Sequence, residues 1–244
     1  MKSATSAGRE DRLGPWGADL AAFVGVIFRP DATFARLAVR RPLLVPFAAG
    51  TVVFLGLAWL SLRVTAVALG GHAGVSPEAE ALFARLAPWS VALAPVGFVL
   101  RWVAVASVLW ATGIVAGAPL TWRGAAVVTA YGATPLVAGE VVDLVGLALT
   151  DPRTALDVPA WTRLLSLQGL VPVSAESTLV HTLAGHVHPF SLASLWLWCA
   201  GWSAFRGHDA RAAWAGGLAW SVIWLVVAVT SHWMQTLSHG ALGA

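Results

Sequence analysis

The stretch LLVPFAAGTVVFLGLAWLSL, residues 43–62, decides the fold class of this chain. It contains no charged residue, and a helix needs about 20 consecutive apolar residues to cross the hydrocarbon core of a bilayer. Pro42 and Pro46 lie near its start, where a helix tolerates proline. The stretch therefore predicts a transmembrane helix.

Similar apolar stretches follow along the chain, at about 89–115, 125–149, 190–205 and 210–231. The stretch 190–205 is the shortest of them. Together with 43–62 they predict an all-α fold, a polytopic membrane helix bundle of five transmembrane helices. We expect this membrane domain to cover residues 43–232.

The composition supports a membrane protein. Of the 244 residues, 58% are hydrophobic and 11% are charged, and the mean hydropathy is +0.75. A soluble domain has about 45–50% apolar and about 25% charged residues. The composition excludes a soluble domain, a disordered chain and a disulfide scaffold, and the single cysteine, Cys199, can form no disulfide within the chain.

Shorter elements are expected outside the spans. Residues 1–17 form a polar tail without a signal peptide, and 18–28 are apolar but too short to cross a membrane. They precede DATFARLAVRR, a helix with Asp31 as its N-cap, so 18–42 are expected to form cytoplasmic or interfacial amphipathic helices. The last residues, 233–244, are expected to form a short outer tail.

The connections between spans are predicted as follows. Residues 63–88 are a polar-leaning connection that includes a short amphipathic helix, PEAEALFARLA. Residues 150–189 are the longest connection, with short helices at about 159–168 and 174–184. Asp209 is expected to cap the last span.

The basic residues predict the orientation. With the N-terminus in the cytoplasm, ten Lys and Arg residues fall in inner segments and four in outer ones, as positively charged inner loops require. The formal net charge of +3 and the pI of about 10.0 therefore reflect the basic residues of the inner segments, which set the topology. The basic residues are too few and dispersed to predict nucleic-acid binding.

Four local patterns occur in one order along the chain: FRPDATFARL before the first span, AAVVTAYGATPLV at the third, HPFSLASLWLWCAGW at the fourth and RAA at the fifth. This order resembles bacterial members of the Yip family, the Ypt/Rab-interacting-protein-like multi-pass proteins whose eukaryotic relatives bind Rab/Ypt GTPases. The resemblance covers about residues 25–230. It implies a five-helix bundle, a cytoplasmic N-terminal segment and no established enzymatic activity. We expect the protein in a bacterial plasma membrane.

Three charged residues fall inside predicted spans. Glu140 and Asp143 are three residues apart and share one helix face, and Arg101 lies in the preceding span. Charges at this depth cost at least about 2.5 kcal/mol each unless they are neutralised or paired. Either Arg101 pairs with Glu140 or Asp143 in a structural contact, or the three residues form a wet functional site.

The histidines His181, His186 and His188 lie in one outer segment, HTLAGHVH. Imidazole with a carboxylate from Asp143 or Glu140 suits zinc or another divalent metal, which needs three or four converging ligands. The spacing does not fit one helix face, and no metalloprotease signature is present. The other interpretation is interfacial polar residues near a helix end.

Tyr131 and Pro135 are expected at a kink of the third span, because proline removes a backbone hydrogen bond from a helix. The kink is either structural or a hinge for transport. Arg36, Arg40 and Arg41 are expected at the inner membrane surface, where they would face anionic lipid headgroups or a protein partner.

The leading functional hypothesis is a membrane scaffold or interaction protein of the Yip type, without catalytic residues or cofactor. One alternative is a small transporter or permease component that uses Arg101, Glu140 and Asp143. The other alternative is an outer-face metal-binding protein or metalloenzyme that uses the three histidines with Glu140 or Asp143. The oligomeric state does not follow from the sequence.

Overall fold

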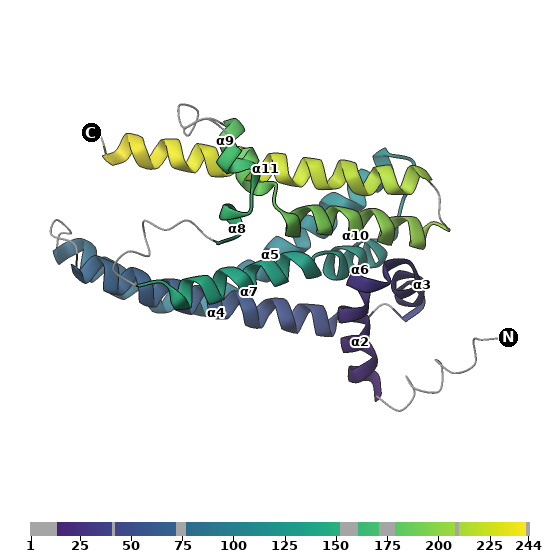
Figure 1. Cartoon of the computed structure of the whole chain (residues 1–244), viewed down its shortest axis with the longest axis horizontal. Coiled ribbons are helices and arrows are strands. Elements are labelled where there is room, and N and C mark those ends of the chain that lie inside the picture. The colour runs from purple at the N-terminus through teal and green to yellow at the C-terminus, as the bar shows by residue number, and fades with distance from the viewer. Residues whose placement is uncertain are drawn as a thin grey trace. The chain divides into compact units, whose positions relative to one another are not determined.

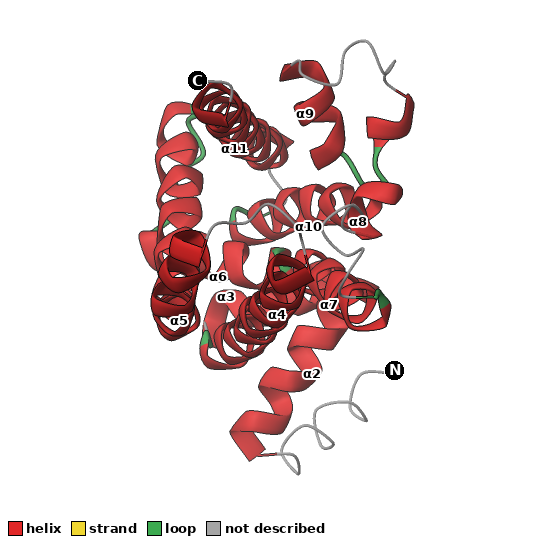
Figure 2. Ribbon diagram, turned by 90° about the vertical axis from the view of Figure 1, so that its left-hand side faces the viewer, coloured by secondary structure: helices red, strands yellow, loops and turns green. Residues whose placement is uncertain are grey.

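The computed structural model describes residues 14–40, 42–71, 77–151, 161–170, 179–207 and 210–242. All regular secondary structure in these ranges is helical and no strand occurs there (Figures 1 and 2), which confirms the all-α prediction. The elements are α2 (Gly14–Phe28), α3 (Pro30–Arg40), α4 (Leu44–Gly71), α5 (Pro77–Val115), α6 (Trp122–Gly132), α7 (Thr134–Leu149), α8 (Trp161–Leu164), the 3-10 helix η1 (Leu167–Leu170), α9 (Leu179–His186), α10 (Pro189–Phe205) and α11 (Ala210–Leu242).

Four described stretches are long and apolar enough to cross a membrane: Leu44–Val67, Ala81–Val115, Trp122–Leu149 and Ala213–Thr230. They support the predicted polytopic membrane bundle. The remaining predicted span, 190–205, coincides with α10, which has 17 residues. The count of five spans stays a prediction.

Several helices extend beyond the predicted boundaries. The predicted connection 63–88 is largely helical, because α4 continues to Gly71 and the predicted amphipathic helix at 77–87 is the first part of α5. The helix α11 likewise continues through most of the segment 233–244, to Leu242, and the assignment of that segment as an outer tail stays a prediction. The thickness of the hydrocarbon core limits the apolar part of a helix but does not end the helix there.

Other predicted elements differ in detail. The described part of the helix expected at 159–168 contains two short elements, α8 and η1, and the described part of the helix expected at 174–184 belongs to α9. Asp31 lies in the first turn of α3 and is not its N-cap, because the helix already begins at Pro30. Asp209 and Arg41 lie outside the described residues.

The chain divides into two compact units. The first unit contains Met1–Ala49, Trp102–Pro135 and Ala193–Trp220. The second contains Gly50–Arg101, Leu136–Leu192 and Ser221–Ala244. Each unit is described by itself below.

The core of the first unit joins α2 and α3 to α6 and α10. Fully buried members include Val26 on α2, Phe34 on α3, and Val127 and Tyr131 on α6, with Leu197 of α10 1% exposed. Figure 1 shows α2 and α3, in dark purple, beside α6. Close packing of these side chains holds α2 and α3 against α6 and α10.

Glycine makes the helix contacts of the first unit close. A Cβ atom at Gly201 of α10 would lie 2.9 Å from Cε1 and Cζ of Phe34, and one at Gly132 of α6 would overlap the indole of Trp198. Small residues at such positions let membrane helices approach each other closely. The aromatic rings of Phe34 and Trp198 therefore occupy space that any larger residue at 201 or 132 would fill.

Two buried hydrogen bonds add to this packing. The Ser194 hydroxyl donates to the carbonyl of Gly132 over 2.8 Å, and the Trp202 indole N–H donates to the carbonyl of Ala118 over 2.9 Å. A buried carbonyl without a partner costs about 1–3 kcal/mol. Ser194 and Trp202 of α10 therefore provide hydrogen-bond donors for carbonyl groups that lie at the end of α6 and in the turn before α6.

The contact at Gly132 gives a direct stability test. We expect Gly132→Ala to lower the thermal unfolding temperature in detergent, because the added methyl group displaces Trp198 and overpacking costs about 1–3 kcal/mol. Gly97→Ala is the matched control, since a Cβ at that helical position meets nothing within 4 Å. The control is expected to keep or raise stability through helix propensity. Equal effects of the two substitutions would contradict the close contact.

Candidate functional site

The candidate site lies on α7, in the second unit. Glu140 and Asp143 lie one turn apart on this helix, as their spacing predicts. Both Glu140 and Arg101 lie inside stretches that are long and apolar enough to cross a membrane, Trp122–Leu149 and Ala81–Val115 respectively.

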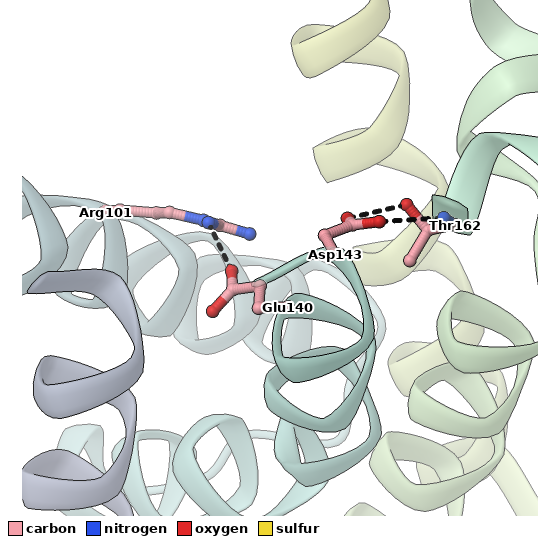
Figure 3. A network of polar contacts seen from close by, with 4 residues as sticks. All are labelled: Arg101, Glu140, Asp143 and Thr162. Carbon is pink, nitrogen blue, oxygen red and sulfur yellow. Dashed lines mark hydrogen bonds and ion pairs between the residues drawn. The ribbon is translucent and has the colours of Figure 1, made fainter. Parts of the chain in front are cut away.

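Arg101 and Glu140 form an ion pair (Figure 3). Nη1 of Arg101 donates to Oε1 of Glu140 over 3.1 Å. The Arg101 side chain is 51% exposed in the protein and that of Glu140 is 20% exposed. The pair links α5 to α7, and it neutralises two charges that would otherwise stand alone within membrane-spanning helices.

Asp143 has a different partner. Its Oδ1 accepts a hydrogen bond from the backbone N–H of Thr162 and its Oδ2 accepts one from the Thr162 hydroxyl, each over 2.8 Å (Figure 3). Thr162 lies in the first turn of the short helix α8, where backbone N–H groups lack partners within the helix. Asp143 therefore caps α8 and fastens it to α7.

These contacts decide between the pairings left open by the sequence. Arg101 binds Glu140, and the second carboxylate is held by the loop helix. Thr162 could not be predicted as the partner, because it lies 19 residues after Asp143 and the sequence does not show how the connection folds back onto α7. The only signal was its position near the start of the predicted helix at 159–168.

His181, His186 and His188 each contact a different side chain among the described residues. The side chain of His181 bonds Gln168 of η1, the ring of His186 packs against Trp224 at a centroid distance of 5.0 Å, and the ring of His188 lies 6.0 Å from that of Phe190. Among the described residues, no group of three or more His, Cys, Asp and Glu side chains could hold a metal ion. The zinc hypothesis therefore gains no support there and stays a prediction.

His188 and Ser191 cap the start of α10 reciprocally. Nδ1 of His188 accepts from the Ser191 N–H over 3.4 Å, while the Ser191 hydroxyl oxygen accepts from the His188 N–H over 3.0 Å. With Pro189 at the first helical position, this arrangement is a capping box in which histidine replaces the usual serine or threonine. The cap requires an unprotonated Nδ1.

Burial lowers the pKa of His188 below its ordinary value of 6.5, against the opposing effect of the Asp143 carboxylate. As the pH falls, His188 of the unfolded chain therefore binds a proton before His188 of the folded protein does. The stabilising contribution of neutral His188 is lost as the pH falls below about 6.5.

His188→Asn tests this sign, because asparagine also caps a helix but does not titrate in this range. We expect the stability of the wild-type protein, measured by thermal unfolding in detergent, to fall relative to His188→Asn between about pH 7.5 and about pH 5. A difference between the two proteins that is independent of pH would contradict the neutral cap.

The predicted kink lies in the first unit, where the third span is interrupted at Ala133. Pro135 has no N–H for the carbonyl of Tyr131, and the hydroxyl of Thr134 donates to that carbonyl instead, over 2.7 Å. The freed backbone group is thus satisfied locally, as membrane helices require. Tyr131 itself is fully buried in the core.

Two of the predicted surface arginines, Arg36 and Arg40, line an open groove between α2 and α3 together with Asp19. The volume of this groove is about 440 Å³. Asp19 was not singled out in the sequence, where it is a lone acid in an apolar stretch.

The Arg101–Glu140 pair can be tested by a double-mutant cycle. We expect Arg101→Leu and Glu140→Leu each to destabilise the protein, because each leaves one charge unpaired in the membrane, and the double substitution to destabilise it less than either one. Thermal unfolding in lipid nanodiscs measures the effect, with Arg85→Leu near the start of α5 as the control. Additive effects of the two substitutions would contradict a paired role.

Comparison with known proteins identifies one relationship. A family model described as Yip1 domain matches residues 24–238, which is most of the chain. No curated protein and no solved structure matches the sequence at a significant level.

Proposed function

Because this chain belongs to the Yip1 domain family and folds as a polytopic helical membrane protein, we propose that it is a membrane scaffold that binds a protein partner. The resemblance found in the sequence is confirmed by the family match. The proposed docking platform is the N-terminal helix pair, α2 and α3, which precedes the first span.

One observation carries this proposal. The helix pair is fixed to α6 by fully buried side chains, among them Val26 and Phe34, while Asp31 and Ala32 at the start of α3 are exposed. A rigid element with an exposed face can bind a partner without the ordering cost that a flexible tail incurs.

The polar contacts of the second unit support a scaffold over a transporter. Glu140 is bound by Arg101, and both oxygens of Asp143 are bound by Thr162. Intramembrane carboxylates of transporters line a substrate or ion pathway or a proton relay. Here the two acids instead fasten α5 and α8 to α7.

The proposed location is a bacterial plasma membrane, with the N-terminus in the cytoplasm and the C-terminus outside. The excess of Lys and Arg in the segments assigned to the inner side supports this orientation. It would expose the helix pair to cytosolic proteins.

Photocrosslinking tests the platform. A photoreactive amino acid at Asp31 or Ala32 in the full-length protein is expected to give a reproducible protein adduct in cells, identified by mass spectrometry. The same group at Val226, which is 58% exposed within the last candidate span, is the control and is expected to give no such adduct. The absence of any reproducible adduct from both α3 positions would count against a protein-binding platform.

A further inference from the structure

The helix α2 has an apolar face that the protein leaves uncovered. Its members repeat at helical spacing and are between 40% and 77% exposed: Trp16, Leu20, Val24, Ile27 and Phe28. The helix has 15 residues, about 22 Å in length, so it cannot cross a bilayer. An exposed apolar face on a short helix next to membrane spans suits the interfacial region of the bilayer.

The groove between α2 and α3 is separate from this face and combines small apolar side chains with charged ones. Ala18, Ala22 and Ala35 line it with small apolar side chains, while Arg36 and Arg40 contribute two positive charges and Asp19 one negative charge. Arg36 and Arg40 are four residues apart, so they lie on one side of α3. The formal charge of the lining is therefore positive by one unit.

The position of the groove in the sequence indicates its depth relative to the membrane. Pro42 lines the groove, and the first candidate span begins at Leu44. The basic end of α3 therefore lies at the beginning of a membrane-spanning helix, where lipid headgroups are found. Arginines at this level attract anionic headgroups.

We propose that this groove binds an anionic phospholipid that carries one negative charge and hydroxyl groups in its headgroup, as phosphatidylglycerol does. The phosphate accepts hydrogen bonds from Arg36 and Arg40, which guanidinium groups form well with phosphate oxygens. The headgroup hydroxyls donate to Asp19. The acyl chains extend along the small apolar residues of the groove.

This site differs from the proposed protein-binding positions at Asp31 and Ala32. A bound lipid would fix the helix pair to the membrane surface, whichever protein the platform binds. Lipid binding and protein binding can therefore fail independently.

The test uses the purified full-length protein and native mass spectrometry with added phosphatidylglycerol or phosphatidylcholine. We expect preferential retention of phosphatidylglycerol, and a loss of about thirtyfold in its affinity in Arg36→Gln/Arg40→Gln, which corresponds to about 1 kcal/mol per arginine. The matched control is Arg123→Gln/Arg206→Gln, which removes the same charge from two exposed positions of the first unit. The control is expected to retain the lipid fully.

A charge-neutral variant separates the groove from net charge. Ala35→Trp fills the groove from an exposed position and is expected to lower the retention of phosphatidylglycerol while the unfolding temperature stays unchanged. Glycerol phosphate is expected not to compete, because it lacks the acyl chains.

Equal retention of the two lipids would overturn the proposal, as would equal loss in the two double variants or full competition by glycerol phosphate. A protein adduct in place of a lipid adduct from a photoreactive group at Val39 in the groove would also overturn it.

Discussion

The contact between Phe34 of α3 and Gly201 of α10 is the constraint on which the first unit depends. The ring edge lies 2.9 Å from where a Cβ of residue 201 would be, so only glycine leaves room for it. With Phe34 in this position, Val26 and Leu37 reach the same core as Tyr131, and α2 and α3 become part of the membrane domain instead of a separate tail. The proposed platform and the proposed lipid groove both require this fixed geometry.

In the second unit, the contacts of a few charged side chains have a comparable role. Glu140 and Asp143 share a helix face, yet one binds a neighbouring span and the other caps a loop helix. His188 serves as a cap in its neutral form. An unpaired polar group within a membrane raises the free energy of the folded protein. In this unit the polar groups are paired, and each pair fixes which two elements contact each other.

Much of the fold followed from the sequence. Apolar stretches of bilayer length located α4, α5, the α6–α7 span and α11, and Pro135 located the break near Ala133, because both signals are local. The ends of the helices were predicted poorly. Residues 63–71 and 77–88, predicted as parts of a connection, belong to α4 and α5, because a helix can continue past its apolar stretch. The contact of Gly201 with Phe34 could not be inferred, because the two residues lie far apart along the chain. The same holds for the partner of Asp143.

Hydrogen exchange of the full-length protein in nanodiscs, comparing wild type with Gly201→Leu, tests most directly whether the N-terminal helix pair is fixed to the membrane domain. If Phe34 holds the pair, the amides of α3 exchange slowly in the wild type and much faster in Gly201→Leu, while the amides of α11 within Ala213–Thr230 are unchanged. Fast exchange of α3 in the wild-type protein, or exchange unaffected by the substitution, would contradict a fixed helix pair.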